Sequence, residues 1–291
     1  MSNFILRAER GGPAIEGIHF FSFPGGERHV RLPVLEAYAA DARWELTAHL
    51  DDAQGVVDLL LLSDALRRHI PQGSALHLVL PYVPYARQDR VAVAGEPFSA
   101  AVFCGLVNNL RFDSVTVMDP HSAVVVDLLE RVVVVPAADL VAPALERAGR
   151  QDLLAQAVLV APDAGASPRV KAVAQALSVY RQGQGAQSEA VQVVQALKKR
   201  DPVTGRLSAP ELAQDIPTDR PLLVVDDICD GGGTFIQLAQ VLRARTQAPL
   251  YLYVTHGIFS KGLAPLLECF DAVFCAHPFA AVADKFLQAG A

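Results

Sequence analysis

The chain has 291 residues, enough for about two domains, and 52% of them are hydrophobic, which excludes a disordered protein. Charged residues make up only 19% and give a formal net charge of -6, so the chain lacks the positive field that general nucleic-acid binding requires. No apolar run reaches the ~18 residues of a membrane span, and no secretion signal is recognisable, so we expect a cytoplasmic protein that does not bind membranes. The four cysteines form no CxxC pair, so we expect free thiols. We expect no binding to nucleic acid.

Short apolar runs alternate along the chain with segments of helical periodicity. The predicted strands are, in chain order, 44–50, 75–80, 114–118, 132–135, 157–160, 191–197, 221–225, 249–254 and 272–275. The predicted helices between them cover 55–69, 98–110, 140–148, 168–177, 234–245 and 263–269. This alternation predicts an α/β fold with mainly parallel sheets flanked by helices, and the continuous Val and Leu runs predict strands that are buried on both faces.

The two halves of the chain share a coarse pattern, which predicts a duplicated domain. In each half two apolar strands are followed by polar loops, VPYARQD and DPHSA in the first half and PDAGA and DDICDGGGT in the second. We place the N-terminal domain at 1–138 and the C-terminal domain at 139–291. Ligands bind at the carboxyl ends of the strands in open α/β sheets, so these four loops are the expected site.

Two further segments have the composition of loops. Arg181–Glu189 contains two glycines among polar residues, and we predict a loop there. Lys198–Gln214 is rich in charge and contains two prolines and a glycine, and it leaves one predicted strand and returns to another. We interpret it as a mobile flap.

The strongest motif is Val224–Thr234, VVDDICDGGGT, in which an apolar strand is followed by three acids and three glycines. Glycines allow a close approach of the backbone to a ligand, and the amides at a helix start attract an anion. Thr234 is predicted to cap that helix. Two adjacent carboxylates can hold a vicinal diol or a metal ion. A phosphate cradle beside a diol clamp describes a site for ribose 5-phosphate, whereas a P-loop and a Rossmann fingerprint are both absent.

This motif resembles the phosphoribosyl-pyrophosphate-binding motif of type I phosphoribosyltransferases and phosphoribosyl pyrophosphate synthetases. Five other segments resemble the synthetases in particular and follow in the family's order: FPGGERHVRL (23–32), PYVPYARQDR (81–90), VMDPHSA (117–123), VAPDAGASPRVKAVA (160–174) and THGIFSKG (255–262). The resemblance implies two tandem phosphoribosyltransferase-like domains and an enzyme that transfers the β,γ-pyrophosphate of ATP to ribose 5-phosphate.

The resemblance also implies roles for individual residues. Ribose 5-phosphate is expected to bind to Asp226, Asp227, Asp230, Gly231, Gly232, Gly233 and Thr234. ATP is expected to contact Gly25, Gly26, Glu27, Arg87, Gln88, Asp89 and His121. His121 and Asp163 match residues linked to Mg²⁺, and Lys198 and Arg200 match a catalytic K-x-R pair. Taken alone, the same residues allow simpler interpretations: an ion pair of Arg87 with Asp89, helix capping by Asp163, and a solvated charge cluster at 198–200.

The sequence departs from the family pattern at two positions. Gly25 stands where the family has an acid that helps to recognise adenine, and Gly231 stands where threonine is usual, which removes one hydroxyl donor from the phosphate loop. Two other functions remain open at this stage, a phosphoribosyltransferase and a non-catalytic homologue of the synthetase. We expect a homo-oligomer in which the segment Phe23–Glu27 completes the ATP site of a neighbouring subunit.

Overall fold

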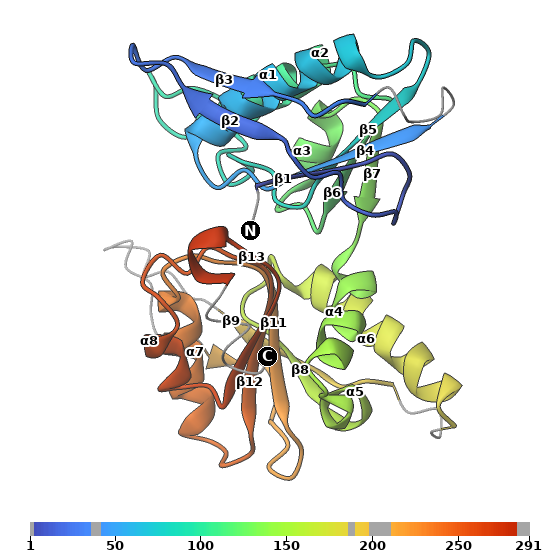
Figure 1. Ribbon diagram of the computed structural model, residues 1–291. Coiled ribbons are helices and arrows are strands. Elements are labelled where there is room, and N and C mark those ends of the chain that lie inside the picture. Colours follow the sequence, from blue (N-terminus) through green and yellow to red (C-terminus); the bar gives the residue numbers. More distant parts are fainter. Residues whose placement is uncertain (1–2, 36–41, 186–189, 198–210, 284–291) are drawn as a thin grey trace. The chain divides into compact units, whose positions relative to one another are not determined.

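A computed structural model describes residues 3–35, 42–185, 190–197 and 211–283 of the chain (Figure 1). The chain divides into two compact units, unit 1 (Met1–Val135) and unit 2 (Pro136–Ala291). The boundary predicted after residue 138 falls in the first turn of a helix, because α4 of unit 2 begins at Ala137.

Unit 1 contains a five-stranded sheet in the order β1-β4-β5-β6-β7, which is parallel except for β1, and a separate antiparallel hairpin, β2-β3. The strands are β1 (Phe4–Arg7), β2 (His19–Ser22), β3 (Arg28–Arg31), β4 (Arg43–Ala48), β5 (Ala75–Leu80), β6 (Ser114–Met118) and β7 (Val132–Val135). The helices are α1 (Ala53–His69), α2 (Ser99–Asn109) and α3 (Ala123–Leu128).

The sheet of unit 1 is less buried than its sequence predicts. In β5 and β6 buried and half-buried residues alternate, so only one face of these strands is fully covered. In β7, which is an edge strand of four valines, Val133 and Val134 are 49% and 39% exposed. The prediction of strands buried on both faces is therefore wrong for unit 1, because an apolar run specifies a strand without specifying what covers it.

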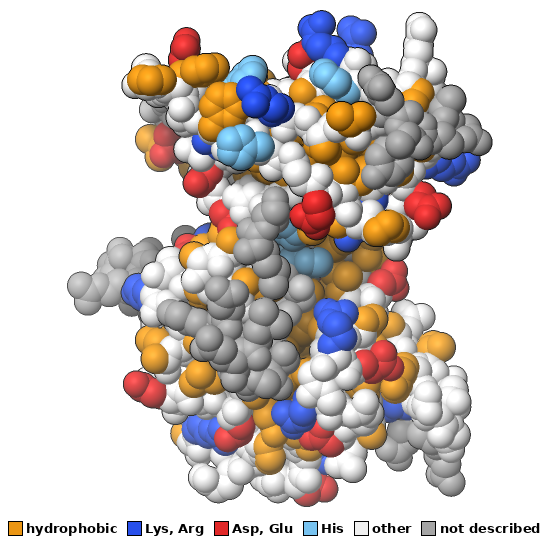
Figure 2. All heavy atoms as spheres, viewed as in Figure 1, with side chains coloured by type: hydrophobic (Ala, Val, Ile, Leu, Met, Phe, Trp, Pro, Cys, Tyr) orange, Lys and Arg blue, Asp and Glu red, His pale blue; other side chains and the backbone are white. Residues whose placement is uncertain are grey.

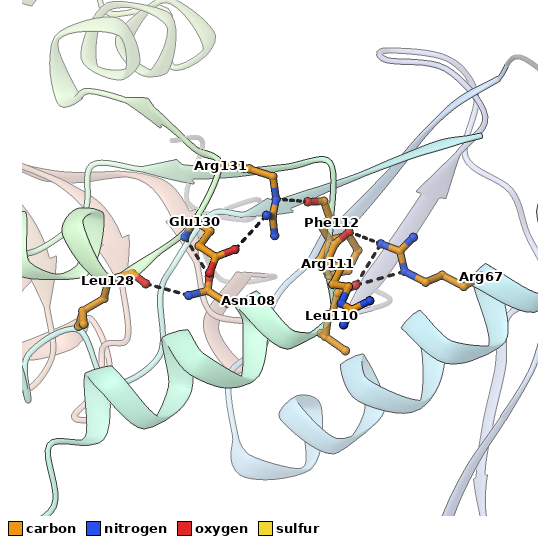
Figure 3. Close-up of polar contacts among 8 residues, drawn as sticks. All are labelled: Arg67, Asn108, Leu110, Arg111, Phe112, Leu128, Glu130 and Arg131. Carbon is orange, nitrogen blue, oxygen red and sulfur yellow. Dashed lines mark hydrogen bonds and ion pairs between the residues drawn. The ribbon is translucent and has the colours of Figure 1, made fainter. Parts of the chain in front are cut away.

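The amino ends of β6 and β7 are held by side chains that bind backbone carbonyl groups (Figure 3). Arg67, near the end of α1, donates to the carbonyl oxygens of Leu110 and Arg111. Asn108, in the last turn of α2, donates to Leu128 O at 2.9 Å and accepts from Glu130 N at 2.9 Å. Ligands bind at the opposite ends of parallel strands, so we interpret this network as structural.

Unit 2 contains a six-stranded sheet in the order β10-β9-β8-β11-β12-β13, parallel except for β10. The strands are β8 (Val158–Ala161), β9 (Val193–Leu197), β10 (Glu211–Leu212), β11 (Leu222–Cys229), β12 (Leu250–Gly257) and β13 (Ala272–Pro278). The helices are α4 (Ala137–Arg147), α5 (Gln151–Gln156), α6 (Ser167–Gly183), α7 (Gly233–Arg243) and α8 (Ala264–Leu267).

The central strand of unit 2, β11, is buried on both faces, as its sequence predicts. Leu222 and Val224 pack into a core with Leu238 of α7, whereas Leu223 and Val225 pack into a second core that includes residues of α4 and α6. Figure 1 shows α7 and α8 on one side of this sheet and α4 to α6 on the other. Two apolar cores, one on each face, are the arrangement expected for a parallel sheet between helices.

The elements predicted from the sequence are all present, and the strands 75–80, 114–118 and 132–135 have the predicted bounds. The sequence missed β1, the β2-β3 hairpin, α3, α5 and β10, all of them short. The loop predicted at Arg181–Glu189 is wrong at its start, since α6 continues to Gly183.

No helix within the described ranges combines the length and the apolar character needed to cross a membrane. The four cysteines are free thiols. Burial raises the pKa of Cys229, at the end of β11, to about 12, and it raises the pKa of Cys104 to about 11. These thiols stay protonated at neutral pH and are poor nucleophiles.

Candidate functional site

The acids of the VVDD motif lie inside β11 rather than at its end. The strand was predicted to stop at Val225, but it continues to Cys229 because β12 pairs with it over its whole length. On the other side, β8 pairs with β11 only as far as Val224. Asp226 and Asp227 therefore lie beyond the last residue of β11 that pairs with β8, at the carboxyl edge of the sheet.

Arg169 of α6 bridges the two carboxylates of this pair. Its Nη1 lies 3.5 Å from Asp226 Oδ1, and its Nη2 lies 3.5 Å from Asp227 Oδ2. Asp226 Oδ1 also accepts a hydrogen bond from the backbone N–H of Asp227 at 2.9 Å. The side chains of Asp226 and Asp227 are only 16% and 7% exposed, so the arginine partly neutralises two acids that are largely removed from water.

Burial is the main cause that raises the pKa of Asp226 well above its ordinary value, and the adjacent charge of Asp227 raises it further. The hydrogen bond from Asp227 N and the charge of Arg169 act in the opposite direction and are smaller. A group that donates hydrogen bonds to this pair, such as a sugar diol, or a cation beside it, would relieve the cost of holding two carboxylates together.

The glycine loop turns sharply from β11 into α7. Gly232 is the N-cap of α7 and has a φ of 75°, in the left-handed region that glycine adopts without strain. The predicted capping role of Thr234 is wrong, because the helix begins one residue earlier, at Gly233, and no side chain caps it. The first backbone N–H groups of α7 lack partners within the helix, as at any helix start, and are suited to an anion.

A second turn, which follows β12, packs against the glycine loop. The backbone N–H groups of Ile258 and Phe259 both donate to Cys229 O, at 2.9 and 3.1 Å. The hydroxyl of Ser260 donates to Asp230 Oδ1 at 2.6 Å. Through these three hydrogen bonds the turn fixes the position of Asp230, the third acid of the motif.

Gly257, the last residue of β12, is required by the packing of this turn. A Cβ at this position would lie 2.0 Å from Phe259 Cε2 and 2.8 Å from Cys275 Sγ. We expect Gly257→Ala to lower the free energy of unfolding by about 1–3 kcal/mol, because the buried ring of Phe259 must shift. Thermal unfolding tests this against Gly233→Ala, where nothing lies within 4 Å of the added Cβ. Equal melting temperatures for the two variants would contradict it.

Asp163 follows β8, the neighbour of β11, and lies at the same edge of the sheet. Its Oδ1 accepts from Ala166 N at 3.0 Å, immediately before α6 begins at Ser167. This bond is made to the N-cap residue of α6, and no side chain caps that helix, so the simpler interpretation of Asp163 as a helix cap is not supported. The hydrogen bond involves only Oδ1 of Asp163 and does not test the prediction that Asp163 binds a metal ion.

In unit 1 the predicted ATP residues follow β5 and β6, which are parallel neighbours. Arg87, Gln88 and Asp89 lie in the turn after β5, where Gln88 N donates to Tyr85 O at 2.8 Å. Asp89 pairs at 4.0 Å with Arg90, so the ion pair that we considered for Arg87 and Asp89 is not the one formed. His121 follows β6 and is exposed. The fold therefore brings these loops to one edge of the sheet in unit 1.

The remaining residues predicted to bind ATP, Gly25 to Glu27, form the tip of the β2-β3 hairpin, where Phe23 N donates to Glu27 O at 2.9 Å. Side chains of the hairpin form an aromatic cluster: the ring of Phe21 lies 5.5 Å from His19, 5.4 Å from Phe23 and 5.2 Å from His29. Figure 2 shows hydrophobic, histidine and basic side chains together on the surface of unit 1, and Arg28 and Arg31 lie over the rings of Phe20 and Phe21.

Lys198 and Arg200, the predicted catalytic pair, lie outside the described residues. The strands on either side of 198–210 are described: Leu197, the last residue of β9, pairs with Glu211, the first residue of β10. Since β9 runs parallel to β8, its carboxyl end lies at the same edge of the sheet as Asp163.

Two residues of this edge were missed from the sequence. Arg169 belongs to the quoted segment VAPDAGASPRVKAVA, but its ion pairs with Asp226 and Asp227 depend on α6 crossing next to β11. Lys261 belongs to THGIFSKG, and its side chain lies against Gly231. In both cases the motif was visible, whereas the contact depends on the order of the strands.

No group of three or more His, Cys, Asp and Glu side chains suited to a metal is present in the part of the chain that the structure describes. The predicted metal residues belong to different units, His121 to unit 1 and Asp163 to unit 2. Their pairing therefore stays a prediction.

Comparison with known proteins agrees with this geometry. The phosphoribosyl transferase domain family matches residues 137–257. Ribose-phosphate pyrophosphokinase from Pyrococcus furiosus is 30% identical over 85% of this chain and 80% of its own length, and the enzyme from Thermococcus kodakarensis is 30% identical over 86% and 81%. A crystal structure of phosphoribosylpyrophosphate synthetase from Mycobacterium smegmatis, at 23% identity, covers 88% of this chain and 78% of that chain with a TM-score of 0.68, which confirms the predicted fold of tandem phosphoribosyltransferase-like domains. On this evidence the chain belongs to the ribose-phosphate pyrophosphokinase family.

Proposed function

We propose that this chain is a ribose-phosphate diphosphokinase, which transfers the pyrophosphate of ATP to the anomeric hydroxyl of ribose 5-phosphate. The anomeric oxygen forms a bond to the β-phosphorus, the bond from that phosphorus to the α,β-bridging oxygen breaks, and AMP leaves. The main support for the proposal is the pair of largely buried carboxylates of Asp226 and Asp227. Both form ion pairs with Arg169, and the glycine loop follows them in the chain.

In this proposal the two ends of the sugar phosphate bind to adjacent parts of β11 and α7. Asp226 and Asp227 accept hydrogen bonds from the ribose hydroxyls, and the loop from Asp230 to Thr234 binds the 5-phosphate through backbone N–H groups. Arg169 holds both carboxylates in place and limits the cost of their burial. Catalysis of this kind depends on alignment and on neutralising charge rather than on a covalent intermediate.

ATP is assigned to the residues predicted from the resemblance: Gly25, Gly26, Glu27, Arg87, Gln88, Asp89 and His121. The exposed guanidinium of Arg87 has the geometry to bind phosphate oxygens in a bidentate manner. Lys198 and Arg200 are proposed to stabilise the charge that develops on the transferred group.

Mg²⁺ is the proposed cofactor. The ion is bound in proteins through one or two carboxylates together with substrate phosphates and water, so a single carboxylate such as that of Asp163 fits it without a cluster of three protein ligands. When bound, the ion would neutralise phosphate charge. His121 and Asp163 are the residues that we propose hold it.

The decisive test is incubation of the purified protein with ATP, Mg²⁺ and ribose 5-phosphate, followed by detection of AMP. AMP that forms only in the presence of the sugar phosphate supports the synthetase activity. Release of pyrophosphate from phosphoribosyl pyrophosphate that depends on an added base, without formation of AMP, would assign the chain to the phosphoribosyltransferases instead. A protein that binds the substrates but forms neither product would be a non-catalytic homologue.

We also propose a homo-oligomer in which the β2-β3 hairpin of one subunit contacts another. The exposed aromatic cluster around Phe21 and the exposed residues Val133 and Val134 of the edge strand β7 are apolar surfaces of the kind that mark protein interfaces. Closed symmetry is the common arrangement for such assemblies.

Light scattering at micromolar concentration tests the assembly. We expect the active species to have at least twice the chain mass of 31.1 kDa. Phe21→Asp should reduce that mass, while the exposed substitution Val179→Asp on α6 of unit 2 should not. A fully active species of 31.1 kDa would refute the shared ATP site.

A further inference from the structure

We infer that Lys261 binds the 5-phosphate of the sugar substrate and is the cation that completes the glycine loop. This inference rests on the proposed function, and it adds a residue that neither the motif nor its resemblance assigns. The contacts of the turn that follows β12 carry the argument.

The position of Lys261 is fixed by its neighbours in the chain. Ile258 and Phe259 are hydrogen-bonded to Cys229, and Ser260 is hydrogen-bonded to Asp230. Gly262 N then donates to Phe259 O at 2.7 Å, which closes the turn around residues 260 and 261. The buried ring of Phe259 anchors the turn beneath the sheet edge. The backbone of Lys261 is therefore fixed by a hydrogen-bonded turn, from which its exposed side chain extends.

The side chain of Lys261 runs along the face of Gly231. If Gly231 carried a Cβ, the three nearest atoms to it would be Cε, Cδ and Cγ of Lys261, at 3.5, 3.7 and 3.9 Å. The aliphatic part of the Lys261 side chain therefore lies against Gly231, on the side where another residue would carry its Cβ. The ammonium group is one bond beyond Cε, on a side chain that lies against Gly231 of the loop proposed to bind the phosphate.

The negative charge of this edge favours a cation at the loop. Asp226, Asp227 and Asp230 place three carboxylates near the proposed binding site of a phosphate dianion. Arg169 is engaged with the first two of these acids. Among the described residues, the ammonium of Lys261 makes no ion pair or hydrogen bond with another side chain, so it is available to a ligand. An ammonium group is a common phosphate ligand at such loops.

Lys261→Met tests this, because methionine keeps an unbranched stem and removes the charge. We expect KM for ribose 5-phosphate, and its Kd by calorimetry without ATP, to rise about 10-fold or more, as for loss of a charge-assisted hydrogen bond. The kcat and the KM for ATP should stay within about threefold of wild type. Lys261→Arg should retain most of the affinity.

Lys171→Met is the matched control, since Lys171 is an exposed lysine of the same unit that lies on α6 beside Gln175 and Ser178. It should leave all three constants unchanged. A wild-type enzyme that forms AMP, together with a Lys261→Met variant whose KM and Kd for ribose 5-phosphate are within twofold of wild type, would overturn the role of Lys261 and leave the proposed function intact. A wild-type protein that forms no AMP would refute the proposed function, and the calorimetric comparison would still decide whether Lys261 binds the sugar phosphate.

Discussion

Replacing Lys198 by alanine is expected to lower kcat by roughly 10²–10³-fold, with the melting temperature unchanged, because a cation that stabilises charge only in the transition state contributes to kcat more than to binding. Lys198 directly follows Leu197, the last residue of β9. That strand end lies at the carboxyl edge of the unit 2 sheet, the edge that carries Asp163 and the acids of β11. The measurement is steady-state formation of AMP at saturating ATP and ribose 5-phosphate.

Lys199→Ala is the matched control for this prediction, since it removes the same charge one residue away. We expect it to lower kcat by less than about 10-fold. A rate of Lys198→Ala within about threefold of wild type would remove Lys198 from the mechanism. Equal losses in the two variants would indicate that the KKR cluster acts through its total charge, which is the simpler interpretation of these residues.

The sequence predicted the parallel strands of both units well because each one is a short run rich in apolar residues between turns. It predicted their surroundings less well. The run Val132–Val135 forms β7 as expected, yet two of its valines are substantially exposed, because β7 is at the edge of its sheet. The β2-β3 hairpin was missed because its strands have four residues each and no apolar alternation strong enough to identify them.

At the carboxyl edge of the unit 2 sheet, too, the sequence predicted the local motif but not its surroundings. The motif in β11 identified the acids and the glycine loop, because their residue types are unusual side by side. It could not identify Arg169 or Lys261, which come from α6 and from the turn after β12. Those contacts depend on which strands are neighbours, and strand order is a long-range property that local patterns do not contain. The predicted cap at Thr234 failed for a local reason: the left-handed conformation of Gly232 starts the helix earlier.

Asp226 offers the sharpest test of the sugar site, because its substitution should affect binding and stability in opposite directions. We expect Asp226→Asn to raise KM for ribose 5-phosphate by about 10- to 100-fold, as a charged acceptor for the ribose hydroxyls is lost. KM for ATP should change by less than about threefold. Each constant is measured by varying one substrate while the other is saturating.

The same substitution, Asp226→Asn, should not lower the stability of the ligand-free protein and should raise it at neutral pH. Burial and the charge of Asp227 raise the pKa of Asp226 in the folded state, so the folded protein loses stability as the pH rises from the unfolded pKa, about 3.9, through the higher folded pKa. Asparagine has no charge to bury. At pH 7 the melting temperature of Asp226→Asn should therefore equal or exceed that of wild type, and the difference should shrink as the pH approaches 4.

Asp219→Asn provides the control, because Asp219 is exposed and precedes the opposite end of the same strand. It should change neither the KM for ribose 5-phosphate nor the pH dependence of the melting temperature. If Asp226→Asn leaves the KM for ribose 5-phosphate unchanged and raises that for ATP, the two substrate pockets must be exchanged between the units. If it lowers the melting temperature at pH 7 by several degrees, the ionised carboxylate stabilises the fold, and the bridge from Arg169 outweighs the repulsion between Asp226 and Asp227.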